Sequence, residues 1–65
     1  MKIIVNGEAL EIGAPTLAAL LDDLGKGEAK VATSVNEAFV SKHQRADHSL
    51  HKGDRVEIVA PRQGG

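Results

Sequence analysis

The 65-residue sequence contains no cysteine. Disulfide bonds, thiolate metal sites and a cysteine nucleophile are therefore excluded. The absence also fits a cytoplasmic protein, which is the location that we expect. Any sulfur chemistry in which this chain takes part must draw its sulfur from another molecule.

Aromatic residues, net charge and long apolar runs are also scarce. Phe39 is the single aromatic residue, so the chain offers no stacking platform for nucleic-acid bases. A net charge of −1 provides no basic field for nucleic acid or for an anionic membrane. No apolar run approaches the roughly 20 residues that cross a bilayer. We therefore expect neither a nucleic-acid partner nor a membrane partner.

The length limits the chain to one domain, residues 1–65, with one core. Its apolar fraction of 42% and charged fraction of 26% are ordinary for a globular protein. A pocket of the kind that small-molecule enzymes use is hard to build at this size. We expect a protein that presents a surface or a terminus to a larger partner, and not an enzyme.

The first half of the chain predicts a β-hairpin followed by a helix. Residues 1–5 alternate at the strand period, Asn6-Gly7 is a strong hairpin signal, and residues 8–12 resume the alternation. Thr16 is a suitable helix N-cap, and Gly25 is the residue type that commonly ends a helix. Between them, leucines at helical spacing form one apolar stripe: Leu17, Leu20, Leu21 and Leu24.

The second half predicts further strands. Residues 30–36 return to the strand period, and a turn at residues 36–38 precedes Phe39 and Val40. Residues 41–49 are polar and are expected to be irregular, with at most one short strand. A turn at Gly53 leads into the last strand, residues 55–59.

These elements predict an α+β fold. One leucine stripe and about four half-apolar strands bury their apolar surfaces together if the sheet wraps around the helix. The first and last strands then lie side by side and parallel, which the helical crossover permits. We expect a ubiquitin-like β-grasp: a mixed sheet of four to five strands around one helix.

Residues 61–65 are expected to form a flexible, projecting tail. Pro61 cannot donate a hydrogen bond to a strand ladder, so pairing should end there. Beyond it, Arg62, Gln63, Gly64 and Gly65 reach about 13 Å when extended. Glycine lacks a Cβ atom, so Gly64 and Gly65 can pass through a narrow channel into a partner's active site. The alternative is a frayed terminus without function.

The reactive group of such a tail is the α-carboxylate of Gly65. A carboxylate is a poor electrophile, and nothing in this chain activates it. A partner that uses ATP can convert it into an acyl-adenylate, which nucleophiles attack readily. A sulfur nucleophile would leave a thiocarboxylate, whereas an amine or a thiol would give a conjugate.

A partner-docking surface is expected on the exposed face of the sheet. Ile4 and Val59 point away from the core and should share a face near the tail, and Phe39 either joins them or belongs to the core. Scattered surface hydrophobic residues are normal, so the pattern alone decides nothing. No metal site is expected, because His43, His48 and His51 lie in a presumed loop without a defined ligand set.

The segments MKIIVNGE, TLAALLDDLG, VATSVNEAFV, KGDRVEIV and APRQGG, in this order and spacing, resemble the sulfur carrier proteins of thiamine biosynthesis. The resemblance implies that an adenylyltransferase related to ubiquitin-activating enzymes adenylates Gly65 with ATP and magnesium. It further implies that sulfur from a cysteine desulfurase makes a C-terminal 1-thioglycine at Gly65, with no cofactor bound to the carrier. Thiazole synthase then takes that sulfur.

Other functions remain open at this point. The small subunit of molybdopterin synthase and carriers for other sulfur-containing metabolites share the fold and the Gly-Gly ending. A ubiquitin-like protein modifier would instead be joined to its targets through Gly65. A passive binding module would not use the tail at all.

Overall fold

The computed structural model describes residues 1–61. The expected tail residues Arg62, Gln63, Gly64 and Gly65 lie outside them. The chain forms five strands, one α-helix and one 3₁₀-helix: β1 (Lys2–Val5), β2 (Glu8–Glu11), α1 (Leu17–Asp23), β3 (Ala32–Val35), β4 (Ala38–Val40), η1 (Lys42–Asp47) and β5 (Arg55–Val59).

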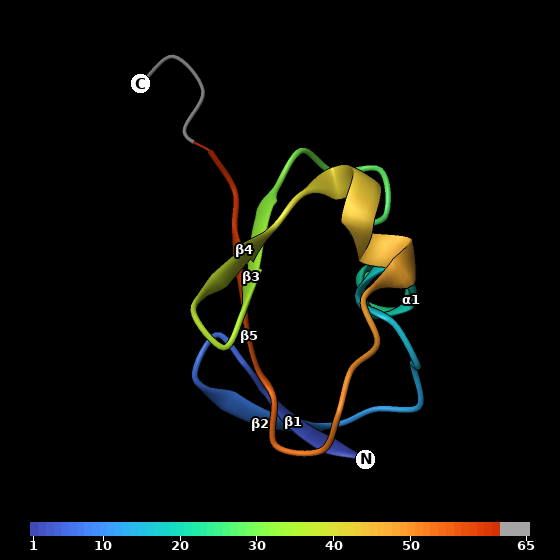
Figure 1. The fold of residues 1–65 in the computed structure, drawn as a ribbon, viewed down its shortest axis with the longest axis vertical. Coiled ribbons are helices and arrows are strands. Elements are labelled where there is room, and N and C mark those ends of the chain that lie inside the picture. Colours follow the sequence, from blue (N-terminus) through green and yellow to red (C-terminus); the bar gives the residue numbers. More distant parts are fainter. Residues whose placement is uncertain (62–65) are drawn as a thin grey trace.

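The strands form one mixed sheet in the order β2-β1-β5-β3-β4. β1 and β5 are parallel, and the other neighbouring pairs are antiparallel. α1 and η1 lie on the same side of this sheet (Figure 1). The expected β-grasp arrangement, with parallel first and last strands, is confirmed.

The local signals at the first turn and around the helix are confirmed. Asn6 and Gly7 both have positive φ, 49° and 85°, as a tight hairpin turn requires. The Thr16 hydroxyl accepts a hydrogen bond of 3.2 Å from the Ala19 amide and so caps α1. Gly25 has φ 76°, the left-handed conformation that ends many helices.

One apolar cluster fills the space between the sheet and α1. Ile3 and Leu17 are completely buried, and Leu20, Leu21 and Val56 are nearly so. Leu24 departs from the expected stripe, because α1 ends at Asp23 and leaves the Leu24 side chain 37% exposed. Three leucines of the stripe, not four, therefore hold α1 against the sheet.

Residues 41–49 are more ordered than the sequence analysis expected. Lys42–Asp47 form the 3₁₀-helix η1, and Ser49 makes an isolated antiparallel bridge with Thr16. The additional short strand is β4, at Ala38–Val40, and so lies before residues 41–49. Ala38 is the first residue of this strand and not part of the turn. That turn uses Asn36 and Glu37, both at positive φ.

η1 is attached to the sheet through a buried arginine. The Arg45 side chain is only 8% exposed. Its Nε donates to Thr33 Oγ1 at 3.1 Å, and its Nη2 donates to the Val31 carbonyl at 2.6 Å. The Thr33 hydroxyl in turn donates to the Val40 carbonyl at 2.8 Å. This chain of hydrogen bonds joins η1, β3 and β4.

Within residues 1–61, no helix has the length and apolar content that crossing a membrane requires.

Candidate functional site

β5, the strand that leads to the tail, lies in the centre of the sheet between β1 and β3. Its last paired residue is Val59, which lies opposite Ala32 of β3. Ala60 and Pro61 follow as exposed residues outside any strand. The expectation that pairing stops before Pro61 is therefore confirmed. β5 runs away from the end of the molecule where the N-terminus lies (Figure 1).

An asparagine from the first hairpin turn extends the attachment of β5. β1 pairs with β5 only through Ile4 and Val5, because the chain then turns at Asn6. The Asn6 side chain makes the hydrogen bonds that a longer β1 would make to β5. Its Oδ1 accepts from the Ile58 amide at 2.8 Å, and its Nδ2 donates to the Ile58 carbonyl at 3.2 Å. The amide group thus pairs with β5 one residue before the ladder ends.

A second asparagine holds the opposite end of the same strand. Asn36, in the turn between β3 and β4, accepts a hydrogen bond from the Arg55 amide through Oδ1 at 3.0 Å. Its Nδ2 donates to Asp54 Oδ1 at 3.1 Å. Both hairpin turns therefore fix the strand that carries the tail. The sequence predicts both asparagines in turns, but it does not predict their contacts with β5.

We predict that Asn6→Gly destabilises the protein by about 1–3 kcal/mol, because it removes both hydrogen bonds to Ile58 and leaves partly buried backbone groups unpaired. Glycine tolerates the positive φ of residue 6, so the turn itself is kept. Chemical denaturation measures the change. Asn6→Asp keeps the acceptor for the Ile58 amide but places a carboxylate oxygen against the Ile58 carbonyl, so it should also lose stability. Equal stability of Asn6→Gly and the original protein would contradict this role.

The face of the sheet opposite α1, called here the outer face, carries the expected docking residues. The exposed fractions of Ile4, Phe39 and Val59 are 36%, 71% and 60%. Phe39 is thus not part of the core. It lies on β4 opposite Ser34 of β3, and Ser34 pairs in turn with Glu57 of β5, two residues before Val59.

Ile4 lies farther from the tail than the sequence analysis expected. It pairs with Arg55, four residues before Val59 on the parallel neighbour β5. Arg55 is exposed beside Ile4, and Glu57 is exposed on the same face between Arg55 and Val59. The Arg55 guanidinium also approaches Glu37 at 3.3 Å. Charged side chains therefore separate Ile4 from Val59, and the two do not form one continuous patch.

Charged groups at the start of β1 form a separate cluster. The N-terminal ammonium lies 2.8 Å from Glu11 Oε2, and this contact holds the pKa of Glu11 below its ordinary value. The pair joins the beginning of β1 to the end of β2, at the end of the molecule where the N-terminus lies (Figure 1). It connects the two strands of the first hairpin.

The histidines do not form a ligand cluster in the part of the chain that the structure describes. His51 Nδ1 lies 3.9 Å from Asp54 Oδ2, in the turn before β5. Residues 1–61 contain no group of three or more histidine or carboxylate side chains placed to hold a metal ion.

Comparison with known proteins gives a match to a family model described as the ThiS family, over residues 3–65. Two relatives share the length of the chain. The sulfur carrier protein ThiS of Escherichia coli is 30% identical, with 100% of both chains covered. The sulfur carrier protein ThiS of Thermus thermophilus is 36% identical, with 94% of this chain and 95% of that protein covered.

A third relative is much longer. A thiazole synthase of Paramagnetospirillum magneticum is 41% identical over all of this chain, which spans only 20% of that protein. Among solved structures, the crystal structure of the thiamine biosynthesis protein ThiS from Geobacter metallireducens matches with a TM-score of 0.83 and 26% identity, covering 100% of both chains. A solution structure of a thiamine biosynthesis protein from the same organism matches with a TM-score of 0.78 and 25% identity, covering 100% of this chain and 88% of that one.

Proposed function

We propose that this chain, which belongs to the ThiS family, carries sulfur for thiamine biosynthesis as a thiocarboxylate on Gly65. The observation that carries the proposal is the family match, which extends over residues 3–65 and so includes the tail. The geometry of β5 supports it, because the strand is held in mid-sheet up to Val59 and its ladder ends before Pro61. Because the end of β5 is held in the sheet, the residues that follow it start from a fixed position.

The chemistry begins on a partner enzyme. An adenylyltransferase of the ubiquitin-activating type binds the tail, and an oxygen of the Gly65 carboxylate attacks the α-phosphorus of ATP. Pyrophosphate leaves, and magnesium on that enzyme screens the phosphate charges. The terminal sulfur of a persulfide that originates from a cysteine desulfurase then displaces AMP and forms an acyl disulfide. A second thiol of the partner attacks the partner's sulfur of that bond, which releases the 1-thioglycine and leaves a disulfide on the partner. The carrier is a co-substrate in the cytoplasm, binds no cofactor itself and supplies no catalytic residue.

Thiazole synthase is the proposed recipient of the sulfur. The relative named thiazole synthase contains a segment that is 41% identical to this whole chain within a protein about five times as long. Joining two proteins in one chain raises the effective concentration of each at the other's site. Such a fusion is favourable where a carrier and a synthase act on each other, and this favours the same pairing for the separate carrier.

The docking surface that we propose is the tail-proximal half of the outer face, centred on Phe39 and Val59, with Ile4 at its far margin. A phenylalanine that is 71% exposed on the same face of the sheet as Val59 is a suitable anchor, since aromatic side chains carry much of the energy of many interfaces.

We predict that Phe39→Ala weakens binding to the adenylyltransferase by about 10-fold, the cost expected when an interface anchor is truncated. The free energy of unfolding should change by less than about 0.5 kcal/mol, because the side chain is exposed. Titration calorimetry and denaturation measure the two quantities. Leu24→Ala, at an exposed leucine at the end of α1, is the matched control. Equal affinities of the Phe39 and Leu24 variants would contradict the proposal.

One incubation separates a carrier from a protein modifier. The protein is mixed with its activating enzyme, ATP and a sulfur source, then examined by intact mass spectrometry and on a gel. A carrier gains the mass difference between one sulfur and one oxygen. Adducts of high mass without that gain would favour a modifier and contradict the proposed function.

A further inference from the structure

A hollow of about 470 Å³ opens beside the point where β5 ends. Val59 and Pro61 line one side of it, so the hollow is continuous with the base of the tail. Val31 and Ala32, at the start of β3, add apolar surface to the same side.

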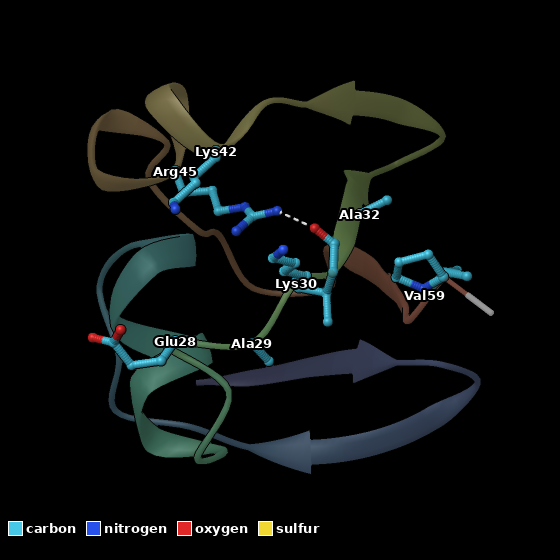
Figure 2. A pocket seen from close by; sticks show the side chains of 9 residues that line it. Glu28, Ala29, Lys30, Ala32, Lys42, Arg45 and Val59 are labelled. Carbon is cyan, nitrogen blue, oxygen red and sulfur yellow. Dashed lines mark hydrogen bonds between the residues drawn. The ribbon is translucent and has the colours of Figure 1, made fainter. Parts of the chain in front are cut away.

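The opposite side of the hollow is basic. Lys42 and Arg45 reach it from η1, and Lys30 reaches it from the segment before β3 (Figure 2). None of the three forms a salt bridge with a carboxylate in residues 1–61. Glu28 is the one acidic residue of the described lining, and Figure 2 shows its carboxylate pointing away from Lys42 and Arg45. The hollow therefore combines a cationic half with an apolar half.

The charge of Arg45 is fixed in place. Its side chain is 92% buried, and its guanidinium donates to two neutral acceptors, the Thr33 hydroxyl and the Val31 carbonyl. Neither acceptor neutralises the positive charge. Because those hydrogen bonds hold the guanidinium, a bound anion would not have to order it, and preorganised charges bind at lower entropic cost.

From these contacts we infer that the hollow receives a carboxylate side chain with an apolar neighbour from the adenylyltransferase. This inference rests on the proposed function, since it requires an enzyme that takes the tail into its active site. The carboxylate would lie among Lys30, Lys42 and Arg45, and the apolar neighbour would contact Val59. The chain as a whole has a net charge of −1, so it does not attract an anionic partner as a whole. The cationic cluster attracts the carboxylate locally and so orients the partner.

The test is the affinity of the carrier for the adenylyltransferase, measured by calorimetry without ATP. The double variant Lys30→Glu/Lys42→Glu should bind about 10- to 100-fold more weakly than the original protein, because close charge pairs across interfaces are worth that much. The matched control Lys26→Glu/Lys52→Glu makes the same change in net charge at exposed lysines that do not line the hollow. Its affinity should stay within about 3-fold, as is usual for peripheral charges.

Three results would overturn the inference: unchanged affinity of the hollow variant, equal weakening of both double variants, or a defect confined to transfer of sulfur to the synthase. Adenylation of the original protein is measured separately, by release of pyrophosphate. If the original protein binds with an affinity that depends on the hollow but is never adenylated, the docking inference stands and the proposed function fails.

Discussion

Replacing Gly64 with tryptophan is expected to reduce adenylation by about 100-fold or more, since small misplacements of a reacting group commonly cost that much. The proposed channel of the activating enzyme admits a chain without side chains, and a tryptophan next to the reacting residue would hold Gly65 away from ATP. Pyrophosphate exchange measures the loss. Deleting Gly65 should abolish the reaction, because the carboxylate is then on the wrong residue.

The same substitution should leave the stability of the protein nearly unchanged. Residue 64 follows the last ladder pair by five positions, so the change in unfolding free energy should stay within about 0.5 kcal/mol, as for surface substitutions. Gly13→Trp is the matched control, because Gly13 is exposed and a Cβ atom added there meets no atom within 4 Å. That variant should be adenylated normally. Normal adenylation of Gly64→Trp would refute the narrow-channel argument.

Arg45→Ala is expected to destabilise the protein by about 2–4 kcal/mol, because it leaves buried polar groups unpaired and creates a cavity. The groups left without their donor are the Val31 carbonyl and the Thr33 hydroxyl. The contact between η1 and β3 would then be lost with them. Denaturation with urea measures the change in unfolding free energy. His43→Ala, at an exposed position of the same helix, should change it by less than about 0.5 kcal/mol.

A double-mutant cycle with Thr33→Val tests whether these groups act as one network. Thr33→Val removes the acceptor of Arg45 Nε and the donor to the Val40 carbonyl. If the network is shared, the two substitutions should be non-additive by about 0.5–3 kcal/mol. Additive effects, or a stability of Arg45→Ala equal to that of the His43 control, would contradict this account.

The parts of the fold that the sequence predicted are those with strong local signals. The Asn6-Gly7 turn was predictable because few residue types accept positive φ, and asparagine and glycine are among them. The helix α1 was predictable from the cap at Thr16 and from the spacing of the leucines. The parallel pairing of β1 and β5 followed from the number of apolar faces that had to be buried. In each case the local pattern and the packed core favour the same structure.

The 3₁₀-helix η1 was missed because it has no apolar periodicity. Its buried contact comes from Arg45, a residue type that is mostly exposed. One signal was present in the sequence: Ser41 and Gln44 have the spacing of a capping box, and the Gln44 side chain accepts from the Ser41 amide at 3.3 Å.

The details of the candidate site depended on strand register, which the sequence did not reveal. That Ile4 and Val59 face outward followed from alternation and is confirmed. That Ile4 pairs with Arg55, away from the tail, is set by where the turn ends β1. The contacts of Asn6 and Asn36 with β5 join residues far apart in the chain, which local patterns do not report.

Fragmentation mass spectrometry of the carrier after incubation with its activating enzyme, ATP and a sulfur source tests the central claim most directly. The account predicts that one sulfur replaces one oxygen and that the change is found in the fragment containing Gly65 and nowhere else. Sulfur located on another residue, or incorporated equally by a chain that lacks Gly65, would contradict it.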